Sequence, residues 1–230
     1  MPENVRYEPN IDYRLNFYSI LNSYVDKNST LLDLGTGTGK VIFENELYKK
    51  CKKVVGVDIS PDLIKACKAK SKGIKNLEFR VMDVLKRMDF EDESFDIITC
   101  MFSPYNPKEV CRLLKKEGVF LLLWGLKGDH KEITKLFPEI FKLWKGKLVF
   151  DTIEERRKRL SSAKLEVICN VTLEYRWIFK DVDALKEFYE KIFQVPLFKG
   201  KEKLLDKLKR YENGEIPISR KICTTVARKS

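Results

Sequence analysis

The chain has 230 residues, of which 43% are hydrophobic and 34% are charged, and its formal net charge is +11. This is enough apolar material to bury the core of one large domain. No apolar run approaches the length of a membrane-spanning helix, and the first residues lack the charged-then-apolar pattern of a signal peptide. We therefore expect a single domain over residues 1–230, in a cytoplasmic protein that does not enter a membrane.

Cysteine usage argues against a metal site. The chain has six cysteines, none of them in a C-x-x-C pair, and His130 is its one histidine. Zinc sites need cysteine and histidine ligands at short, regular spacing. We expect no bound metal and six free thiols.

The first expected element is a helix over residues 10–27. Its apolar side chains recur at helical spacing and form a stripe that can pack on the domain, while aromatic residues, Tyr13 among them, follow a neighbouring stripe. These aromatic side chains either belong to the core or contact a ligand. The spacing leaves both interpretations open.

An apolar run, an acid and three alternating glycines follow between Thr30 and Lys40. This pattern predicts a strand that turns sharply into a helix. Gly35, Gly37 and Gly39 allow backbone conformations closed to other residues, and they let a ligand lie against bare main chain. A tight turn without a ligand would show the same spacing, so the strands that follow have to decide between the two.

Two further apolar runs also end in an acid. The first ends in Asp58, where an α/β nucleotide fold places the carboxylate that accepts hydrogen bonds from ribose hydroxyls. The second ends in Asp83. Three acids at the ends of three successive strands favour a bound ligand over an unliganded turn.

Strands and helices alternate from Thr30 to Trp124, which predicts a parallel sheet covered on both faces. The loop of residues 102–107 leaves its strand at the carboxyl edge, where ligands bind in open α/β folds. Phe102, Ser103 and Tyr105 of this loop are therefore candidates for contact with a substrate.

A polar segment after the strand of residues 119–124 contains Asp129, His130 and Glu132. The histidine is a candidate general base. Asp129 can instead cap a helix, with Glu132 completing a capping box. We favour the capping interpretation.

The end of the chain predicts two strands, residues 164–175 and 220–227, that close the sheet. Two amphipathic helices, residues 181–194 and 201–211, are expected between them. We expect residues 175–211 to form a helical lid inserted before the final strand. Its many aromatic side chains, such as Phe188, either line a substrate pocket or seal the helices to the sheet.

Taken together, five segments resemble the motifs of class I S-adenosylmethionine (SAM)-dependent methyltransferases. They are the D-x-G-x-G-x-G turn, the two strands that end in Asp58 and Asp83, the S-F-D strand of residues 94–102, and the helix-to-strand segment of residues 109–120. More distantly, residues 102–198 resemble a poorly characterised subfamily and large-subunit rRNA guanine-N1 methyltransferases. This chain lacks the cysteine zinc module of those rRNA enzymes.

The resemblance implies a Rossmann-like, seven-stranded, mostly parallel sheet with a SAM-binding core over residues 28–125. In the family the glycine turn packs beneath the methionine half of SAM, Asp33 helps to hold its amino group, Asp58 binds the ribose and Asp83 binds the adenine amino group. The expected cofactor residues are Asp33, Gly35, Thr36, Gly37, Gly39, Asp58, Ile59, Asp83, Val84 and Cys100. The expected acceptor-binding residues are Tyr13, Phe102, Ser103, Tyr105 and Phe188.

We therefore predict methyl transfer from SAM to a small-molecule acceptor by in-line displacement, with no catalytic side chain identified. One alternative is an RNA base methyltransferase, because residues 101–150 and 151–230 carry net charges of +5 and +6. Lysines interleaved with glutamates are, however, more typical of a solvated surface. A second alternative is a regulator that binds SAM without turnover.

Overall fold

The computed structural model describes residues 5–10, 12–137, 150–193, 198–200 and 214–229, apart from the side chains of residues 192 and 193. The chain divides into two compact units. The first, here called the core unit, comprises Tyr13–Trp124, Asp151–Thr172 and Cys223–Ser230; the second unit comprises Met1–Asp12, Gly125–Phe150 and Leu173–Ile222. Two long strands contribute residues to both units, and the single-domain organisation remains a prediction.

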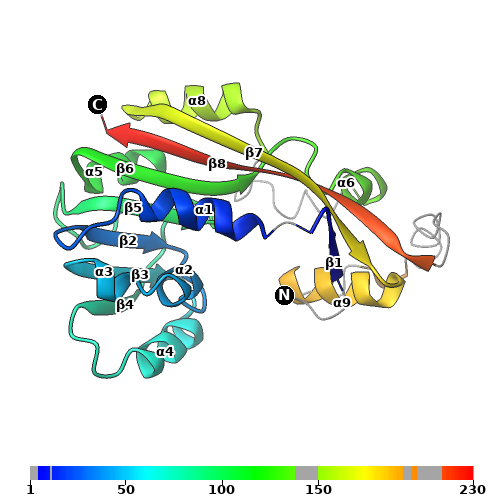
Figure 1. The fold of residues 1–230 in the computed structure, drawn as a ribbon, viewed down its shortest axis with the longest axis horizontal. Helices are drawn as coiled ribbons and strands as arrows, with labels where there is room; N and C mark the ends of the chain where they lie inside the picture. Colours follow the sequence, from blue (N-terminus) through cyan, green and yellow to red (C-terminus); the bar gives the residue numbers. More distant parts are fainter. Residues whose placement is uncertain (1–4, 11, 138–149, 194–197, 201–213, 230) are drawn as a thin grey trace. The chain divides into compact units, whose positions relative to one another are not determined.

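Five parallel strands form one part of an eight-stranded sheet (Figure 1). They are β2 (Thr30–Leu34), β3 (Lys53–Asp58), β4 (Leu77–Val81), β5 (Phe95–Met101) and β6 (Leu114–Gly125). β2 pairs with both β3 and β5, so that Leu32 has Val55 as its partner on one side and Ile98 on the other. All three side chains are fully buried, as expected for parallel strands covered on both faces. The predicted parallel sheet is confirmed.

The strand order reverses between β2 and β5. The full order is β1-β7-β8-β6-β5-β2-β3-β4, so the chain proceeds from β2 to β3 and β4 and then returns to the other side of β2. In open parallel sheets, ligands bind outside the carboxyl ends of the strands at such a reversal. The segments that follow β2 and β5 therefore define the part of the core unit where a ligand is expected.

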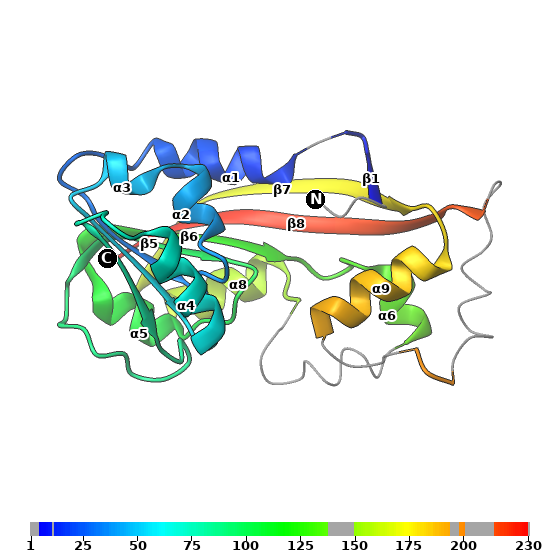
Figure 2. The same cartoon turned by 90° about the horizontal axis from the view of Figure 1, so that it is seen from below.

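Helices cover both faces of the sheet in the core unit (Figure 2). One face carries α1 (Tyr13–Asn22), and the opposite face carries α5 (Pro107–Leu113) and α8 (Ile153–Ser161); two short helices, α2 (Lys40–Glu44) and α3 (Leu47–Lys50), follow β2, and α4 (Pro61–Lys70) follows β3. Local chemistry sets their starts: Ser60 and Asn106 cap α4 and α5 just before a proline, and Thr152 begins a capping box. The expected leading helix is present as α1, with shorter bounds than residues 10–27.

In its described residues, the second unit contains parts of two long strands together with three shorter elements. These are β7 (Leu165–Phe179), β8 (Ile216–Lys229), β1 (Val5–Glu8), α6 (Lys131–Leu136) and α9 (Val182–Phe193). β1 pairs antiparallel with β7, which places Tyr7 opposite Trp177. The sequence predicts seven strands and misses β1, because its four residues are too few to show a strand pattern.

The segment expected to form a lid begins with strand rather than helix. β7 continues to Phe179, so residues 175–179 belong to the sheet, whereas α9 corresponds to the predicted helix of residues 181–194. The predicted helix of residues 201–211 lies outside the described residues. Phe188 of α9 packs edge to face against Trp177, with ring centroids 4.9 Å apart, and against Phe179 at 5.4 Å. These three aromatic residues of the expected lid thus pack against one another within the second unit.

The capping box predicted at Asp129 and Glu132 is wrong. α6 begins at Lys131 after His130, which has a φ of +53° and makes no side-chain cap. Asp129 is buried and accepts hydrogen bonds from Arg220 Nε and the Lys221 amide, both at 2.8 Å, and Glu132 accepts from the Ser219 amide at 2.8 Å. Both acids therefore bind β8, about ninety residues away in sequence.

His130 is buried in an aromatic cluster of the second unit. Its Nδ1 atom is hydrogen-bonded to the hydroxyl of Tyr189, and its ring contacts that of Trp177 edge to face at 5.3 Å. Burial, together with the nearby Arg220 charge, lowers the pKa of His130 to about 3. The imidazole is therefore neutral at physiological pH and a weak base.

The buried Asp129–Arg220 pair is expected to stabilise the fold strongly. Asp129→Asn removes the carboxylate charge that faces a guanidinium only 4% exposed, so we expect it to lower the free energy of unfolding by about 3 kcal/mol or more in urea titrations. The exposed Arg6–Glu215 pair provides the control, because Glu215→Gln should cost less than about 1 kcal/mol. Equal losses for the two variants would contradict this prediction.

Candidate functional site

The three glycines after β2 form the turn that the sequence predicts. Gly35, Gly37 and Gly39 have φ values of +63°, +56° and +75°, which side-chain-bearing residues rarely adopt. A Cβ atom on Gly35 would lie 1.9 Å from Ser103 Oγ, so this glycine permits contact with the loop after β5. A Cβ atom on Gly37 would meet no atom within 4 Å. At Gly37 the turn therefore presents bare main chain to open space.

Asp33, near the end of β2, is a buried carboxylate with an unsatisfied oxygen. Thr99 Oγ1 donates to its Oδ1 atom at 2.7 Å, whereas neither Asp33 Oδ2 nor the buried Thr36 Oγ1 has a hydrogen-bond partner among the described residues. Burial raises the pKa of Asp33 to about 6; the hydroxyl of Thr99, and that of Thr36, which lies near the carboxylate without reaching hydrogen-bond geometry, only partly oppose this. Buried polar atoms normally have partners, so the start of the glycine turn suits a polar or cationic ligand group.

Asp58, at the end of β3, connects the glycine turn to α4. Its Oδ2 atom accepts from the Gly37 amide at 2.9 Å, and its Oδ1 atom accepts from the Ser60 amide at 3.0 Å. Each carboxylate oxygen has a second lone pair, so the side chain can still accept hydrogen bonds from a ligand. The hydrogen bond to Gly37 has no signal in the sequence.

Asp83 follows β4, and its side chain is partly exposed. Its Oδ1 atom accepts from the Leu85 amide at 3.0 Å, and Lys86 Nζ lies 3.7 Å from its Oδ2 atom. The adjacent Val84 side chain is only 7% exposed, so it offers little surface to a ligand.

Exposed apolar side chains gather where β3, β4 and β5 end. They are Ile59 (67% exposed), Val81 (50%), Leu85 (36%) and Phe102 (37%). Apolar surface left open next to polar groups marks many ligand sites. The sequence predicts roles for Ile59 and Phe102 but misses Val81 and Leu85, because an apolar residue at a strand end gives no signal of its exposure.

The loop after β5 brings together three of the predicted acceptor residues. Phe102 has a φ of +52°, and its ring lies edge to face with that of Tyr13 of α1, with centroids 5.8 Å apart. Ser103 packs against Gly35, and its carbonyl accepts from the thiol of Cys100 at 3.0 Å. Cys100 is fully buried, which raises the pKa of its thiol, so its side chain presents no surface to a ligand.

The other two predicted acceptor residues have different surroundings. Tyr105 is directed towards β6 and α8, because its ring lies 5.1 Å from that of Phe120 and its hydroxyl accepts from Arg159 Nη2 at 3.0 Å. Phe188 belongs to the second unit, and its role in acceptor binding remains a prediction.

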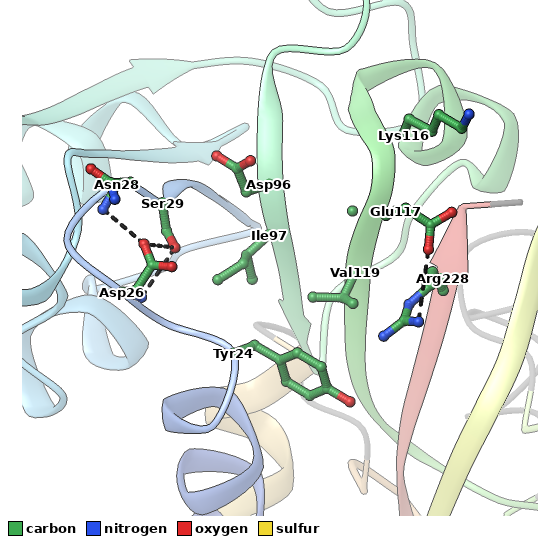
Figure 3. A pocket seen from close by; sticks show the side chains of 11 residues that line it. Tyr24, Asp26, Asn28, Ser29, Asp96, Ile97, Lys116, Glu117, Val119 and Arg228 are labelled. Carbon is green, nitrogen blue, oxygen red and sulfur yellow. Dashed lines mark hydrogen bonds and ion pairs between the residues drawn. The ribbon is translucent and has the colours of Figure 1, made fainter.

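A hollow of about 320 Å³ lies at the amino edge of the core unit's sheet, near the start of β5 (Figure 3). Its carboxylates already have partners: Asp26 accepts from Ser29, Asp96 from Lys115, and Glu117 lies 3.8 Å from Arg228. Open polar groups of the candidate site are therefore found at the carboxyl edge rather than in this hollow. In the described part of the chain, no cluster of three or more histidine, cysteine or acidic residues could hold a metal, and no helix is long and apolar enough to span a membrane.

Comparisons with known proteins show sequence similarity to methyltransferases. YxjB of Bacillus subtilis, whose name assigns it provisionally to 23S rRNA guanine-N(1) methylation, is 36% identical over 96 residues, which is 40% of this chain and 32% of YxjB. The demethylmenaquinone methyltransferase of Lactococcus lactis is 26% identical over 178 residues, 70% of this chain and 64% of that protein.

A solved structure shows the same fold. The YcgJ protein of Bacillus subtilis superposes with a TM-score of 0.70 at 17% identity, covering 94% of this chain and 99% of YcgJ. In sequence, this chain spans less than half of two uncharacterised methyltransferase relatives, 45% of one and 39% of the other. A family model described as a methyltransferase domain matches residues 25–210. This chain therefore belongs to the methyltransferase domain family.

Proposed function

We propose that this protein is a SAM-dependent methyltransferase that transfers the methyl group to a small-molecule acceptor by in-line displacement. One observation carries this proposal. An Asp33 oxygen without a hydrogen-bond partner and the open backbone at Gly37 occur in the same turn, at the point where the strand order reverses. Together these features accommodate a ligand that has a cationic group and lies flat against main chain.

The residues present fit the cofactor, group by group. Asp33 would pair with the amino group, Gly35–Gly39 would lie beneath the methionine half, and Asp58 would accept from the ribose hydroxyls. Asp83 would accept from the adenine amino group, with the exposed Ile59 side chain against the ring. Val84 and Cys100 would contribute through their backbone, because both side chains are buried.

The sulfonium of SAM supplies a methyl group that is already electrophilic, so the protein has to position the acceptor and exclude water. Tyr13, Phe102 and Ser103 would hold a flat acceptor beside the glycine turn. Two other candidate groups are unsuited to proton abstraction: the Cys100 thiol is buried and protonated, and His130 is a weak base in the second unit. Catalysis is accordingly positional.

The breadth of the sequence matches supports a small acceptor. The similarity to demethylmenaquinone methyltransferase, a protein named for a small-molecule acceptor, extends over 70% of this chain, beyond the expected cofactor core. The similarity to YxjB, a protein named for an RNA acceptor, covers 40% of this chain, and the net charge of +11 is also compatible with an RNA acceptor. RNA is therefore the second candidate.

The cofactor assignment is tested with S-adenosylhomocysteine, the product, and a matched pair of glycine variants. At a hundred times its dissociation constant the product should stabilise the protein by about 2.7 kcal/mol, measured as a thermal shift. Gly37→Val should abolish this shift by filling the space over the turn. Gly73→Val is the control, because Gly73 also has a positive φ and open surroundings but lies away from the turn. Equal shifts in both variants would contradict the assignment.

The pKa of Asp33 predicts a pH dependence. Between the ordinary aspartate pKa of 3.8 and about 6, the Asp33 carboxyl is protonated in the folded protein but ionised in the unfolded chain. The free energy of unfolding should therefore fall by up to about 3 kcal/mol as pH rises through that range. An amino group pairs with the ionised form, so affinity for S-adenosylhomocysteine should increase from pH 5 to pH 7 in calorimetric titrations. Asp33→Asn should remove both trends, and an unchanged pH profile would exclude Asp33 as the partner.

Salt distinguishes the two acceptor classes. An RNA acceptor would release counterions from many phosphates, so its Michaelis constant should rise steeply between 50 and 200 mM salt, by roughly a thousandfold for six or more contacts. A small acceptor makes at most one such contact, and we expect its Michaelis constant to change little. Methylation assays with total RNA and with small-molecule extracts, each at several salt concentrations, measure the difference.

A further inference from the structure

A group of charged side chains on and before α8 holds the loop that follows β5. Arg156 is fully buried, and its Nε and Nη2 atoms donate to Asp151 Oδ1 at 3.0 and 2.8 Å. Its Nη1 atom donates to Thr225 Oγ1 of β8 at 3.1 Å. Arg159 Nη2 contacts both Asp151 Oδ2 and the Tyr105 hydroxyl. Asp151 therefore fixes two guanidinium groups, and one of them reaches the loop.

The Asp151 carboxylate is shared between the two arginines of this group. Among the described residues, Asp151 is the acid that pairs with Arg156 and Arg159. Burial raises the pKa of Tyr105, so its hydroxyl stays neutral and adds no negative charge. Asp151 therefore does not neutralise Arg159 alone, because the same carboxylate also pairs with Arg156.

Arg159 is the arginine that can meet a ligand. Its side chain is 35% exposed, whereas those of Asp151 and Arg156 are 1% and 0% exposed. Only its Nη2 atom is engaged; in the described part of the chain its Nε and Nη1 atoms contact no acceptor. The guanidinium also lies over the ring of Tyr105, 5.6 Å from its centroid. A cation held this firmly loses little further freedom when it binds an anion.

The position of Tyr105 connects this cation to the expected acceptor. Tyr105 lies three residues after Phe102 in the loop at the carboxyl edge, next to the segment that would hold the acceptor. We propose that the acceptor is a small organic acid whose carboxylate binds Arg159, with Asp151 and Tyr105 positioning the guanidinium. This inference rests on the proposed function and deepens it by naming the class of acceptor.

Paired probes that differ only in charge test the proposal. Aromatic acids such as 4-hydroxybenzoate and cinnamate, each with its carboxamide, are titrated into protein saturated with S-adenosylhomocysteine and followed by ligand-observed NMR. A charge-assisted hydrogen bond predicts that the acids bind tighter than their amides by about tenfold or more. Arg159→Gln should remove this preference, and Tyr105→Phe, which frees the guanidinium, should reduce it several-fold.

Arg157→Gln is the matched control, since Arg157 is an exposed arginine on the same helix, and it should retain the full preference. Arg159→Lys keeps the charge and should restore part of it, which separates charge recognition from a loss of folding. If the acids bind no better than the amides, or none binds, while S-adenosylhomocysteine binds normally, the inference is overturned and the proposed function stands. If the wild-type protein binds no S-adenosylhomocysteine, the proposed function itself fails.

Discussion

The reversal of strand order between β2 and β5 is the constraint on which the candidate site depends. Because these two strands are neighbours, the glycine turn after β2 and the loop after β5 leave the sheet at adjacent positions. The pairing of β2 with β3 on the other side brings Asp58 within hydrogen-bonding distance of Gly37. Polar groups from three segments of the chain therefore meet at one edge, where two backbone amides hold the carboxylate of Asp58 and the Thr99 hydroxyl holds that of Asp33.

Much of this edge could be predicted from the sequence, because its signals are local. An acid at the end of an apolar run indicates the end of a strand, and glycines at every second position indicate a turn with positive φ values. The turn at Gly35–Gly39 has this conformation. Five parallel strands and their helices were likewise predictable, since burial on both faces leaves continuous apolar runs. The individual roles assigned to Asp33, Asp58 and Asp83 remain predictions.

What the sequence could not supply are contacts between distant residues. Asp129 and Glu132 have the spacing of a capping box, yet the partners that satisfy them are on β8. In the same way, the Arg159 side chain that holds Tyr105 comes from a helix about fifty residues further along the chain. A local pattern gives the type of a polar residue but not its partner, and for buried charges the partner decides the energetics.

The close packing of Gly35 against Ser103 has a consequence for how two ligands communicate. There is no room between Gly35 and Ser103 for even one additional Cβ atom. The turn that would carry the cofactor and the loop that would carry the acceptor are therefore in direct contact. A shift of one segment has to displace the other, because well-packed groups have no free volume to absorb it. Occupancy of either segment should therefore alter affinity at the other, and linkage requires this coupling to be equal in both directions. Binding of the two substrates would then be cooperative without any moving domain.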